Sequence, residues 1–334
     1  MARLRRSDCS AAGIHRRGRG RGFSFEDAEG TTITDEETLQ RIRDLAIPPA
    51  WKEVWICPDP LGHIQATGFD EAGRKQYRYH DRWDLRRATR KYAAMREFAA
   101  ALPQLRRVVR RDIALEGMPR ERALATAVRL LDLGFFRIGG EEYAESNDSY
   151  GLATIRCEHV HRDGEEIVFD FPAKSNQRRI QAIVDEEAIA ALETMRRRRG
   201  GPEDLLAWKE GRRWRDVRSA DVNDYIQEAI GGEFSAKDFR TWSGTLLAAA
   251  ALAGEEKPAS DAAAKRTVNR AVKTVAAALG NTPAVCRRSY IDPRVFDRYR
   301  DGETIDVGRR AASEGRMSER TRQKIEREVL DLID

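Results

Sequence analysis

The stretch Gly73–Leu102, GRKQYRYHDRWDLRRATRKYAAMREFAAAL, changes its periodicity near its middle. Residues 75–79 are rich in β-forming side chains and follow a turn signal, which is typical of a short strand. From Asp84 the apolar side chains recur at a spacing near 3.6, which predicts a long helix to about Leu102. The chain therefore passes here from a β-rich part to a helical part.

The length of 334 residues is enough for two domains. Residues 1–22 are rich in Arg and Gly, and we expect them to form a basic flexible tail. Residues 23–86 contain short strand patterns separated by turns, which predict a small antiparallel domain. Residues 90–334 are mainly helical in pattern. The predicted fold class is α+β, with a small β-rich N-terminal lobe and a larger, mainly α-helical lobe that contains a β-meander.

The meander is expected where LATIRCEHV, the turn HRDGEE, IVFDFPA and RRIQAIV follow one another, with Asp163-Gly164 as the hairpin signal. Lys174 falls on the loop after the second of these strands. Around the meander the pattern predicts a helix that begins after Pro103 and further helices at Pro119–Asp132, Asp185–Arg197, Ser219–Ile230, Lys237–Leu252, Asp261–Leu279 and from about Ser318.

The charge of the chain is unevenly distributed. Lys and Arg total 60 against 55 Asp and Glu, a net charge of +5. Between Arg74 and Arg111 there are thirteen basic residues and three acidic ones, with tyrosines and a tryptophan interleaved. Such a stripe suits the neutralisation of phosphates and contact with sugars and bases. The alternative is a solvated helix face, although such faces usually mix both signs.

Several classes of protein lack support in this sequence. No apolar run reaches the length of a membrane span, and the N-terminal residues lack the apolar segment of a secretory signal. The four cysteines are far apart without CxxC spacing, which favours reduced thiols in a cytoplasm. Motifs of the forms GxxxxGK[ST], GxSxG and HExxH are absent.

Cys157, His159 and His161 alternate on a predicted strand and could share one face as metal ligands. No fourth ligand has a recognisable spacing, so we favour a hairpin face with a hydrogen-bonded histidine. We expect neither a metal nor any other cofactor.

Two arginines lie in apolar surroundings, Arg137 in LLDLGFFRIGGEEY and Arg240 in FSAKDFRTWSG. Burying a guanidinium group is costly unless it meets an anion. A salt bridge to a nearby carboxylate would explain either arginine alone. Together with Lys174 and Tyr290 they resemble a phosphate clamp, because a planar guanidinium can hold two phosphate oxygens.

These residues are arranged as in a known family. RIGGEEY, the hairpin lysine, KDFRTW and Asn281, nine residues before Tyr290, resemble the small type IB DNA topoisomerases of the poxvirus and bacterial kind. GRKQYRYH from Gly73 resembles the family's N-terminal DNA-contacting strand, and GLATIRCEHV resembles the strand after the first catalytic arginine. The resemblance runs from about Leu39 to Phe296.

The resemblance implies the fold of the tyrosine recombinases and type IB topoisomerases, and a reaction without metal or ATP. Tyr290 would attack a DNA phosphodiester and form a 3′-phosphotyrosyl bond with release of a 5′-hydroxyl, after which the strand would swivel and be resealed. Arg137 and Arg240 would clamp the phosphate, Lys174 would act as general acid, and Asn281 would hydrogen-bond a nonbridging oxygen.

The resemblance also implies duplex DNA as the partner of a monomer that closes as a clamp, with residues 23–86 as its smaller part. Such an enzyme would act in the cytoplasm, at the nucleoid. The DNA-contacting residues would be Gln76, Tyr77, Tyr79, Tyr143 and Lys237.

The residue types suit this chemistry. An unperturbed tyrosine has a pKa of about 10, so nearby positive charge must favour its phenolate form. Fixed arginine donors can stabilise the charge that gathers on the equatorial phosphate oxygens, and the basic 5′-alkoxide needs a proton to leave. Many family members have histidine where this chain has Asn281. An amide still donates a hydrogen bond but does not titrate near neutrality.

Two other interpretations are open at this point. A tyrosine recombinase shares the chemistry, but it usually has His-x-x-Arg where this chain has Lys237-Asp-Phe-Arg240, and it usually lacks a β-rich front lobe. A non-catalytic DNA-binding protein would leave the constellation of five residues unexplained.

Overall fold

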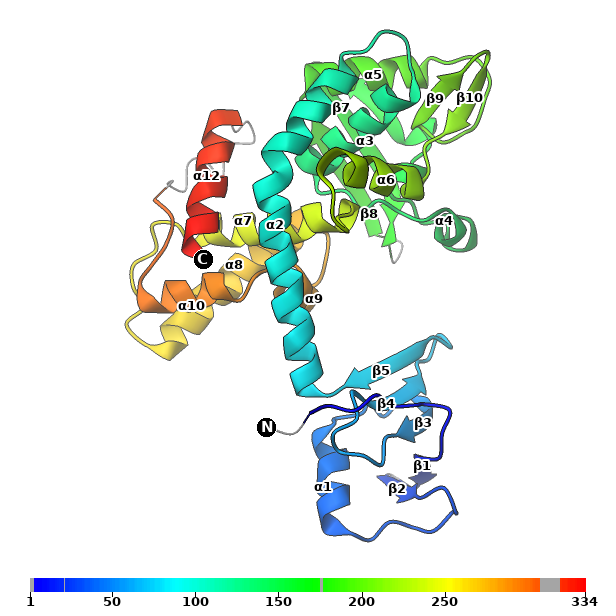
Figure 1. Cartoon of the computed structure of the whole chain (residues 1–334), viewed down its shortest axis with the longest axis vertical. Helices are drawn as coiled ribbons and strands as arrows, with labels where there is room; N and C mark the ends of the chain where they lie inside the picture. The colour runs from blue at the N-terminus through cyan, green and yellow to red at the C-terminus, as the bar shows by residue number, and fades with distance from the viewer. Residues whose placement is uncertain (1–2, 21, 175–176, 307–318) are drawn as a thin grey trace. The chain divides into compact units, whose positions relative to one another are not determined.

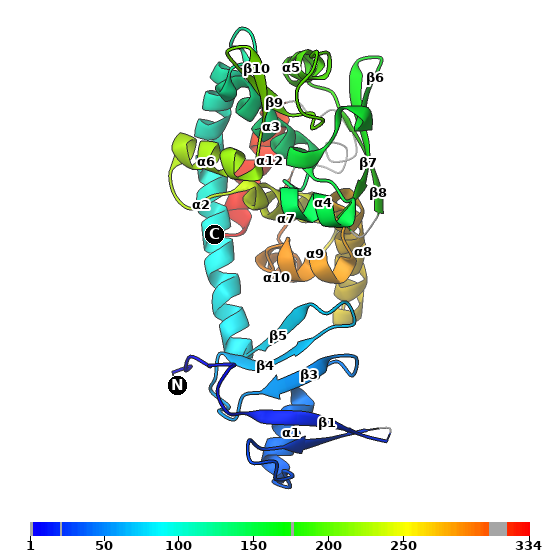
Figure 2. The same cartoon turned by 90° about the vertical axis from the view of Figure 1, so that its right-hand side faces the viewer.

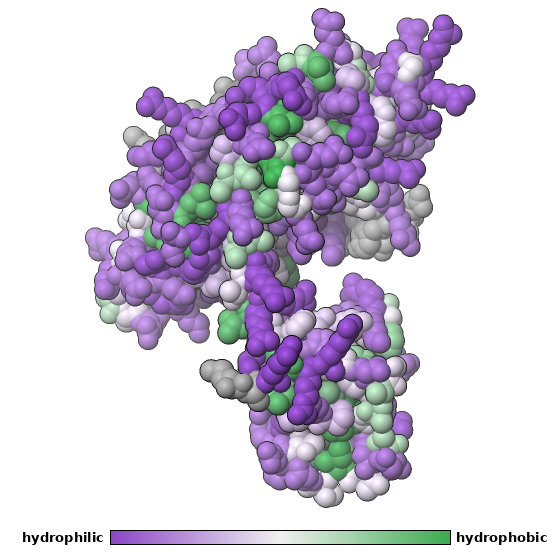
Figure 3. All heavy atoms as spheres, in the orientation of Figure 1, coloured by the Kyte–Doolittle hydropathy of each residue, from purple (hydrophilic) through white to green (hydrophobic). Residues whose placement is uncertain are grey.

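The computed structural model of the chain describes residues 3–20, 22–174, 177–306 and 319–334, apart from the side chains of Tyr143, Glu145 and Asn147. The chain forms two compact units, Met1–Ala93 and Ala94–Asp334 (Figure 1). Hydrophilic side chains cover most of the face shown in Figure 3. Among the helices in the described ranges, none is both long and apolar enough to cross a membrane.

The first unit contains a five-stranded antiparallel sheet with the strand order β2-β1-β3-β4-β5, helix α1 and the start of α2 (Asp81–Ile113). Helix α1 (Glu36–Asp44) begins at Asp35, whose carboxylate accepts a hydrogen bond from the Thr38 amide at 2.8 Å. Its Ile42 is buried among sheet residues that include Ile14 and Ile56. The strands are β1 (Ile14–Arg19), β2 (Gly22–Glu26), β3 (Lys52–Ile56), β4 (Ile64–Phe69) and β5 (Lys75–Tyr79).

The prediction of a flexible tail over residues 1–22 is wrong for its second half. Strand β1 pairs with both β2 and β3, and Ile14 is buried in the core of the sheet. The Arg16 guanidinium donates to the Pro48 carbonyl at 3.0 Å. The Arg- and Gly-rich composition of residues 1–22 predicted a flexible tail. The hairpin is ordered all the same, because one apolar side chain, backbone pairing and arginine contacts hold it.

Helix α2 (Asp81–Ile113) is a single helix that starts in the first unit and continues into the second. The sequence predicted two helices separated at Pro103, and this prediction is wrong. Proline removes one backbone donor. The helix nevertheless continues, because side chains on both sides of Pro103 are buried, among them Phe98, Leu102 and Leu105.

The second unit is mainly helical and contains a three-stranded antiparallel sheet with the order β6-β7-β8. LATIRCEHV was predicted as one strand. It forms two short 3-10 turns, Leu152–Thr154 and Cys157–His159, before β6, so this prediction is wrong. The hairpin of β9 and β10 was not predicted.

After α2, this unit contains further helices and strands in chain order (Figures 1 and 2). They are α3 (Arg120–Gly134), α4 (Glu141–Asn147), β6 (Val160–Asp163), β7 (Glu166–Ala173), β8 (Gln177–Ile183), α5 (Glu186–Arg196), β9 (Ala207–Glu210), β10 (Arg213–Asp216), α6 (Ser219–Ile230), α7 (Ala236–Leu252), α8 (Asp261–Leu279), α9 (Pro283–Ser289), α10 (Arg294–Asp301) and α12 (Glu319–Leu332).

A buried ion network attaches the last helix to the rest of this unit. Arg106 of α2 donates to Asp132 of α3 at 2.9 Å and to Glu326 of α12 at 2.7 Å. Arg322 also pairs with Asp132, at 2.5 Å. Burial by itself raises the pKa of Asp132, but Arg322 and Arg106 outweigh it and lower that pKa to about 2. Arg106, one of the arginines of the basic stripe, therefore stabilises the fold. Other arginines of the stripe also form ion pairs, which are Arg74–Asp70, Arg96–Asp334, Arg110–Glu319 and Arg111–Asp112.

We predict that Asp132→Ala lowers the free energy of unfolding by about 3–5 kcal/mol near neutral pH, because it leaves buried arginines short of a partner. The pKa of Asp132 lies below the ordinary value of 3.8, so its contribution is present above about pH 4 and is lost as the pH falls toward 2. Urea unfolding followed by circular dichroism at both ends of this range measures the difference.

The matched control is Asp297→Ala, which removes an exposed carboxylate paired with Arg300 at 2.6 Å. Asp297→Ala should lower the free energy of unfolding by less than about 1 kcal/mol. Equal losses in the two variants, or a loss for Asp132→Ala that does not shrink in acid, would contradict the assignment.

Candidate active site

The C-terminal end of α8 collects three arginines from three different parts of the fold. Helix α8 ends at Gly280, which has a φ of +60°. The last carbonyls of a helix have no partner within it and carry partial negative charge. Here they accept hydrogen bonds from guanidinium groups: Gly280 from Arg137 at 2.7 Å, Leu279 from Arg240 at 2.8 Å, and Ala278 from Arg179 at 2.5 Å.

These carbonyls hold the three cations in place without neutralising them. Within the described ranges, no carboxylate forms a salt bridge with Arg137, Arg179 or Arg240. The salt-bridge alternative considered for Arg137 and Arg240 is therefore wrong. Three guanidinium groups close together without counter-ions form a site for an anion.

Arg240 is the most deeply buried of the three, with 4% of its surface exposed. It lies on α7, whose first turn is closed by Ser235 and Asp238, and it also donates to the Phe135 carbonyl. Burial, followed by repulsion from Arg137, lowers the pKa of Arg240 to about 10. The group remains charged at neutral pH, at an electrostatic cost that a bound anion would relieve.

Arg137 lies on a loop held by a close contact between two glycines. Gly139 has a φ of +83°, and a Cβ on Gly151 would lie 2.4 Å from the Gly139 nitrogen. The Leu152 amide donates to the Arg137 carbonyl at 2.8 Å. Because only glycines permit this approach, the pair fixes the backbone from which Arg137 extends.

Asn281 lies directly beside this arginine cluster. Its Oδ1 accepts a hydrogen bond from Arg137. Its Nδ2 is buried against the thiol of Cys286, a weak acceptor, and has no hydrogen-bond partner of normal geometry in the described structure. Buried donors in folded proteins usually have a partner, so this donor is available to a ligand.

Tyr290 ends helix α9 and faces Arg240. The centre of the Arg240 guanidinium lies 5.1 Å from the centroid of the tyrosine ring, where the face of the ring attracts the cation. Gly244, one turn after Arg240 on α7, permits this packing, because a Cβ there would lie 2.4 Å from the Tyr290 carbonyl oxygen. The Asp292 amide donates to Thr245 Oγ1 at 3.1 Å, which fixes the chain beyond the tyrosine.

Four of the five catalytic candidates are thus brought together: Arg137, Arg240, Asn281 and Tyr290. Lys174 directly follows β7, as predicted, and its side chain is exposed. No hydrogen bond or salt bridge joins it to the other four within the described residues. The sequence analysis missed Arg179, Gly244 and the glycine pair. The only signal for Arg179 was a basic residue within a strand.

The candidate DNA contacts of the first unit lie on β5. The rings of Tyr77 and Tyr79 stack at 6.0 Å between centroids, with Lys75 and Arg87 over them. Gln76 donates to the Asp70 carboxylate at 2.9 Å. Stacked, partly exposed tyrosines beside cations suit contact with nucleic acid.

In the second unit, Lys237 is exposed in the first turn of α7. Tyr143 belongs to α4, and its side chain lies outside the described residues.

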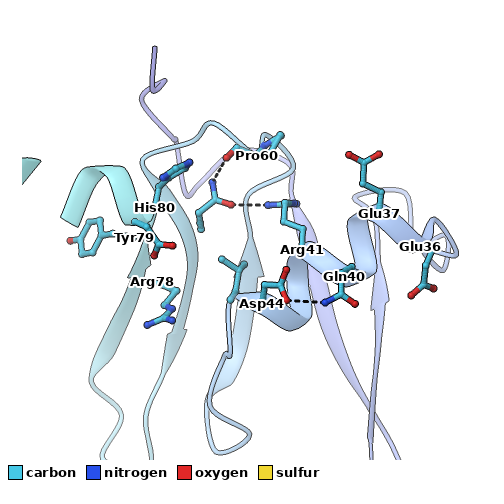
Figure 4. A pocket seen from close by; sticks show the side chains of 12 residues that line it. Glu36, Glu37, Gln40, Arg41, Asp44, Pro60, Arg78, Tyr79 and His80 are labelled. Atoms are coloured by element: carbon cyan, nitrogen blue, oxygen red, sulfur yellow. Dashed lines mark hydrogen bonds between the residues drawn. The ribbon is translucent and has the colours of Figure 1, made fainter. Parts of the chain in front are cut away.

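A separate cavity of about 620 Å³ lies in the first unit, between α1 and the end of β5 (Figure 4). Arg41, labelled in Figure 4, donates a hydrogen bond to Gln65 at 2.8 Å. Acidic and basic side chains both line the cavity, and none of the five catalytic candidates does.

Of the three residues first considered as metal ligands, His159 has another role. His159 Nδ1 accepts from the Arg156 amide at 3.2 Å, and its ring packs edge-on against Tyr150. Among the described residues, no group of three His, Cys, Asp or Glu side chains could hold a metal ion.

An arginine cluster with a facing tyrosine, on a mainly helical unit, defines a protein that acts on phosphate esters. Residues 75–306 match the family described as "Eukaryotic DNA topoisomerase I, catalytic core", and residues 22–70 match "Bacterial DNA topoisomerase IB, N-terminal domain". The chain belongs to the type IB DNA topoisomerase family. This membership decides against the recombinase interpretation.

Individual relatives agree with this assignment. The chain is 30% identical over 310 residues to DNA topoisomerase 1B of Acanthamoeba polyphaga mimivirus, covering 88% of this chain and 92% of the relative. It is 20% identical over 275 residues to DNA topoisomerase I of Monkeypox virus, covering 81% and 84%. DNA topoisomerase 1 of Schizosaccharomyces pombe is 28% identical over 189 residues, which cover 56% of this chain and 22% of the yeast protein.

We predict that inorganic sulfate stabilises the protein through the arginine cluster. At roughly ten times its Kd, sulfate should raise the Tm of the parent protein by about 2–4 °C, because binding to the folded state alone adds about 1.4 kcal/mol. Differential scanning fluorimetry against chloride of equal ionic strength measures this rise.

The rise should disappear in Arg240→Gln and persist in Arg300→Gln, which removes an exposed arginine of α10. An unchanged rise in Arg240→Gln would place the anion elsewhere.

Proposed function

We propose that this protein relaxes supercoiled duplex DNA by cutting one strand transiently, through a 3′-phosphotyrosyl bond to Tyr290. One observation carries the proposal. Arg137, Arg240 and Asn281 form a partly buried donor cluster without a neutralising carboxylate in the described structure, and Tyr290 packs against its most buried member, Arg240. A phosphodiester supplies the missing negative charge.

In the cleavage step the Tyr290 oxygen attacks the phosphorus, and the bond from phosphorus to the 5′ oxygen breaks. Arg240 lies beside the tyrosine ring, so it favours the negative charge on the phenolic oxygen as the attack begins. The equatorial oxygens then gain charge, which Arg137, Arg240 and the free Nδ2 of Asn281 stabilise from fixed positions.

Lys174 is the proposed general acid. Its ammonium group would give a proton to the 5′ oxygen as that oxygen leaves with the electron pair of the broken bond. The exposed position of Lys174 at the end of β7 leaves its side chain available for this role. Resealing is the reverse reaction. The phosphotyrosine preserves the energy of the phosphodiester, so no ATP, metal or other cofactor is required.

Both units are proposed to contact the duplex, so that a monomer acts as a clamp. Gln76, Tyr77 and Tyr79 would contact DNA from β5, and Tyr143 and Lys237 from the second unit. The stacked tyrosines with cations over them support this role. The match to a bacterial N-terminal domain supports action in a bacterial cytoplasm, at the nucleoid.

We predict that the parent protein relaxes plasmid supercoils of either sign in the presence of EDTA and without ATP. Tyr290→Phe should lose relaxation while still binding DNA, because only the nucleophilic oxygen is removed. Agarose gels of topoisomers and a filter-binding assay make the two measurements. Plasmid left supercoiled by the parent protein would refute the function, and relaxation by Tyr290→Phe would refute the choice of nucleophile.

We predict that Gly244→Ala slows strand cleavage by roughly 10²-fold or more, since its Cβ would displace the Tyr290 carbonyl and with it the nucleophile. Single-turnover formation of the covalent adduct measures the rate. Gly18→Ala is the control, because a Cβ at Gly18 meets no atom within 4 Å. A cleavage rate in Gly244→Ala equal to that of the control would show that this close contact does not position Tyr290.

A further inference from the structure

Arg179 is the third guanidinium group at the end of α8, and the mechanism above gives it no task. It lies on β8, in the same hairpin as Lys174. The two strands pair in a defined register, with Phe171 opposite Arg179 and Ala173 opposite Gln177. Lys174 directly follows β7, so the ladder connects its backbone to that of Arg179.

Arg179 anchors this hairpin to α8. Its Nη2 donates to the Ala278 carbonyl at 2.5 Å and to Gln181 Oε1 at 3.1 Å, and its Nη1 lies 3.5 Å from the Ala277 carbonyl. The next two carbonyls of the same helix end hold Arg240 and Arg137. In Figure 2 the first part of β8, which contains Arg179, lies next to α8. One helix end therefore connects the hairpin that carries the acid to the arginines that hold the phosphate.

This anchor has an electrostatic cost. Burial, followed by repulsion from Arg137, lowers the pKa of Arg179. Gly280 has a φ of +60°, in the left-handed region that favours glycine, and a Cβ there would also lie 2.9 Å from Nη1 of Arg179. The adjacent Arg178 is an exposed residue and pairs with the partly exposed Asp170 carboxylate at 2.8 Å. The two neighbouring arginines thus differ in partner and surroundings.

We propose that Arg179 is a positioning residue that places Lys174 for proton transfer to the 5′ oxygen. The inference rests on the proposed function. If Arg179 is removed, the hairpin loses its anchor on α8, whereas Arg137 and Arg240 keep their own bonds to Gly280 and Leu279. Loss of Arg179 should therefore impair the acid step more than the phosphate clamp.

The acid step can be separated by changing the leaving group. With oxygen at the 5′ position, the electron pair of the breaking bond goes to an alkoxide that needs the proton of Lys174. With sulfur in its place, the pair goes to a thiolate, and because a thiol has a pKa of about 8.5 it leaves without a proton. A defect in positioning Lys174 should appear with the oxygen duplex and disappear with the sulfur duplex.

The experiment is single-turnover cleavage of a duplex with one mapped cleavage site, prepared with oxygen or sulfur at the scissile 5′ position. Arg179→Met should cleave the oxygen duplex roughly 10–100-fold more slowly than the parent, as for partial loss of an acid catalyst, and the sulfur duplex at the parent rate. Lys174→Met should show the same pattern more strongly. Arg178→Met should match the parent on both duplexes.

Equal slowing of Arg179→Met on both duplexes would overturn the proposal, since the defect would then lie in the clamp or the fold. Cleavage of both duplexes by Arg179→Met at the parent rate would also overturn the proposal. Thermal unfolding reports whether Arg179→Met is folded. If it is not, Arg179→Lys, which keeps the charge but has its donors on a single nitrogen and loses the two-nitrogen fork, must show the same selective loss on oxygen. A parent protein that cleaves neither duplex would refute the proposed function itself.

Discussion

The structure of this protein depends at its centre on the unpaired carbonyls at the end of helix α8. A helix leaves its last carbonyls without partners, and the macrodipole makes them attractive to cations. Arginines from a loop, from a strand and from α7 meet there on successive carbonyls. Dipoles position these arginines but do not neutralise them. The site therefore keeps its net positive charge for a phosphate. The loop, the strand and α7 that carry the arginines are all held to the end of α8.

The second unit buries arginines in two different ways. Arg106 is surrounded by Asp132 and Glu326, and the network attaches α12 to α2 and α3. Arg240 has carbonyl partners and two arginine neighbours that repel it. The first arrangement is complete and stabilises the fold. The second has a cost in the free protein that an anion would relieve, as expected where function and stability compete.

The sequence predicted the long periodic elements well, including α6 and α8 with their bounds and Lys174 after β7. Two of its errors share one cause, which is that neighbours distant in the chain override local signals. Pro103 lies inside α2 because flanking side chains are buried, and β1 is held in the sheet through Ile14 and His15, which pair with β3. Family motifs indicated four of the residues that meet at the site, but Arg179 and Gly244 belong to no motif.

The sequence by itself determined the two-part organisation, the residue types of a phosphoryl-transfer site and their resemblance to one family. These follow from local periodicity, composition and spacing. Only the tertiary structure decided which of the many arginines are neutralised and which are not, because pairing depends on residues such as Arg106 and Glu326, or Arg137 and Gly280, that are far apart in the chain. The same holds for the contact of Gly244 with Tyr290, since the sequence does not show which residues a glycine will contact after the helices have packed.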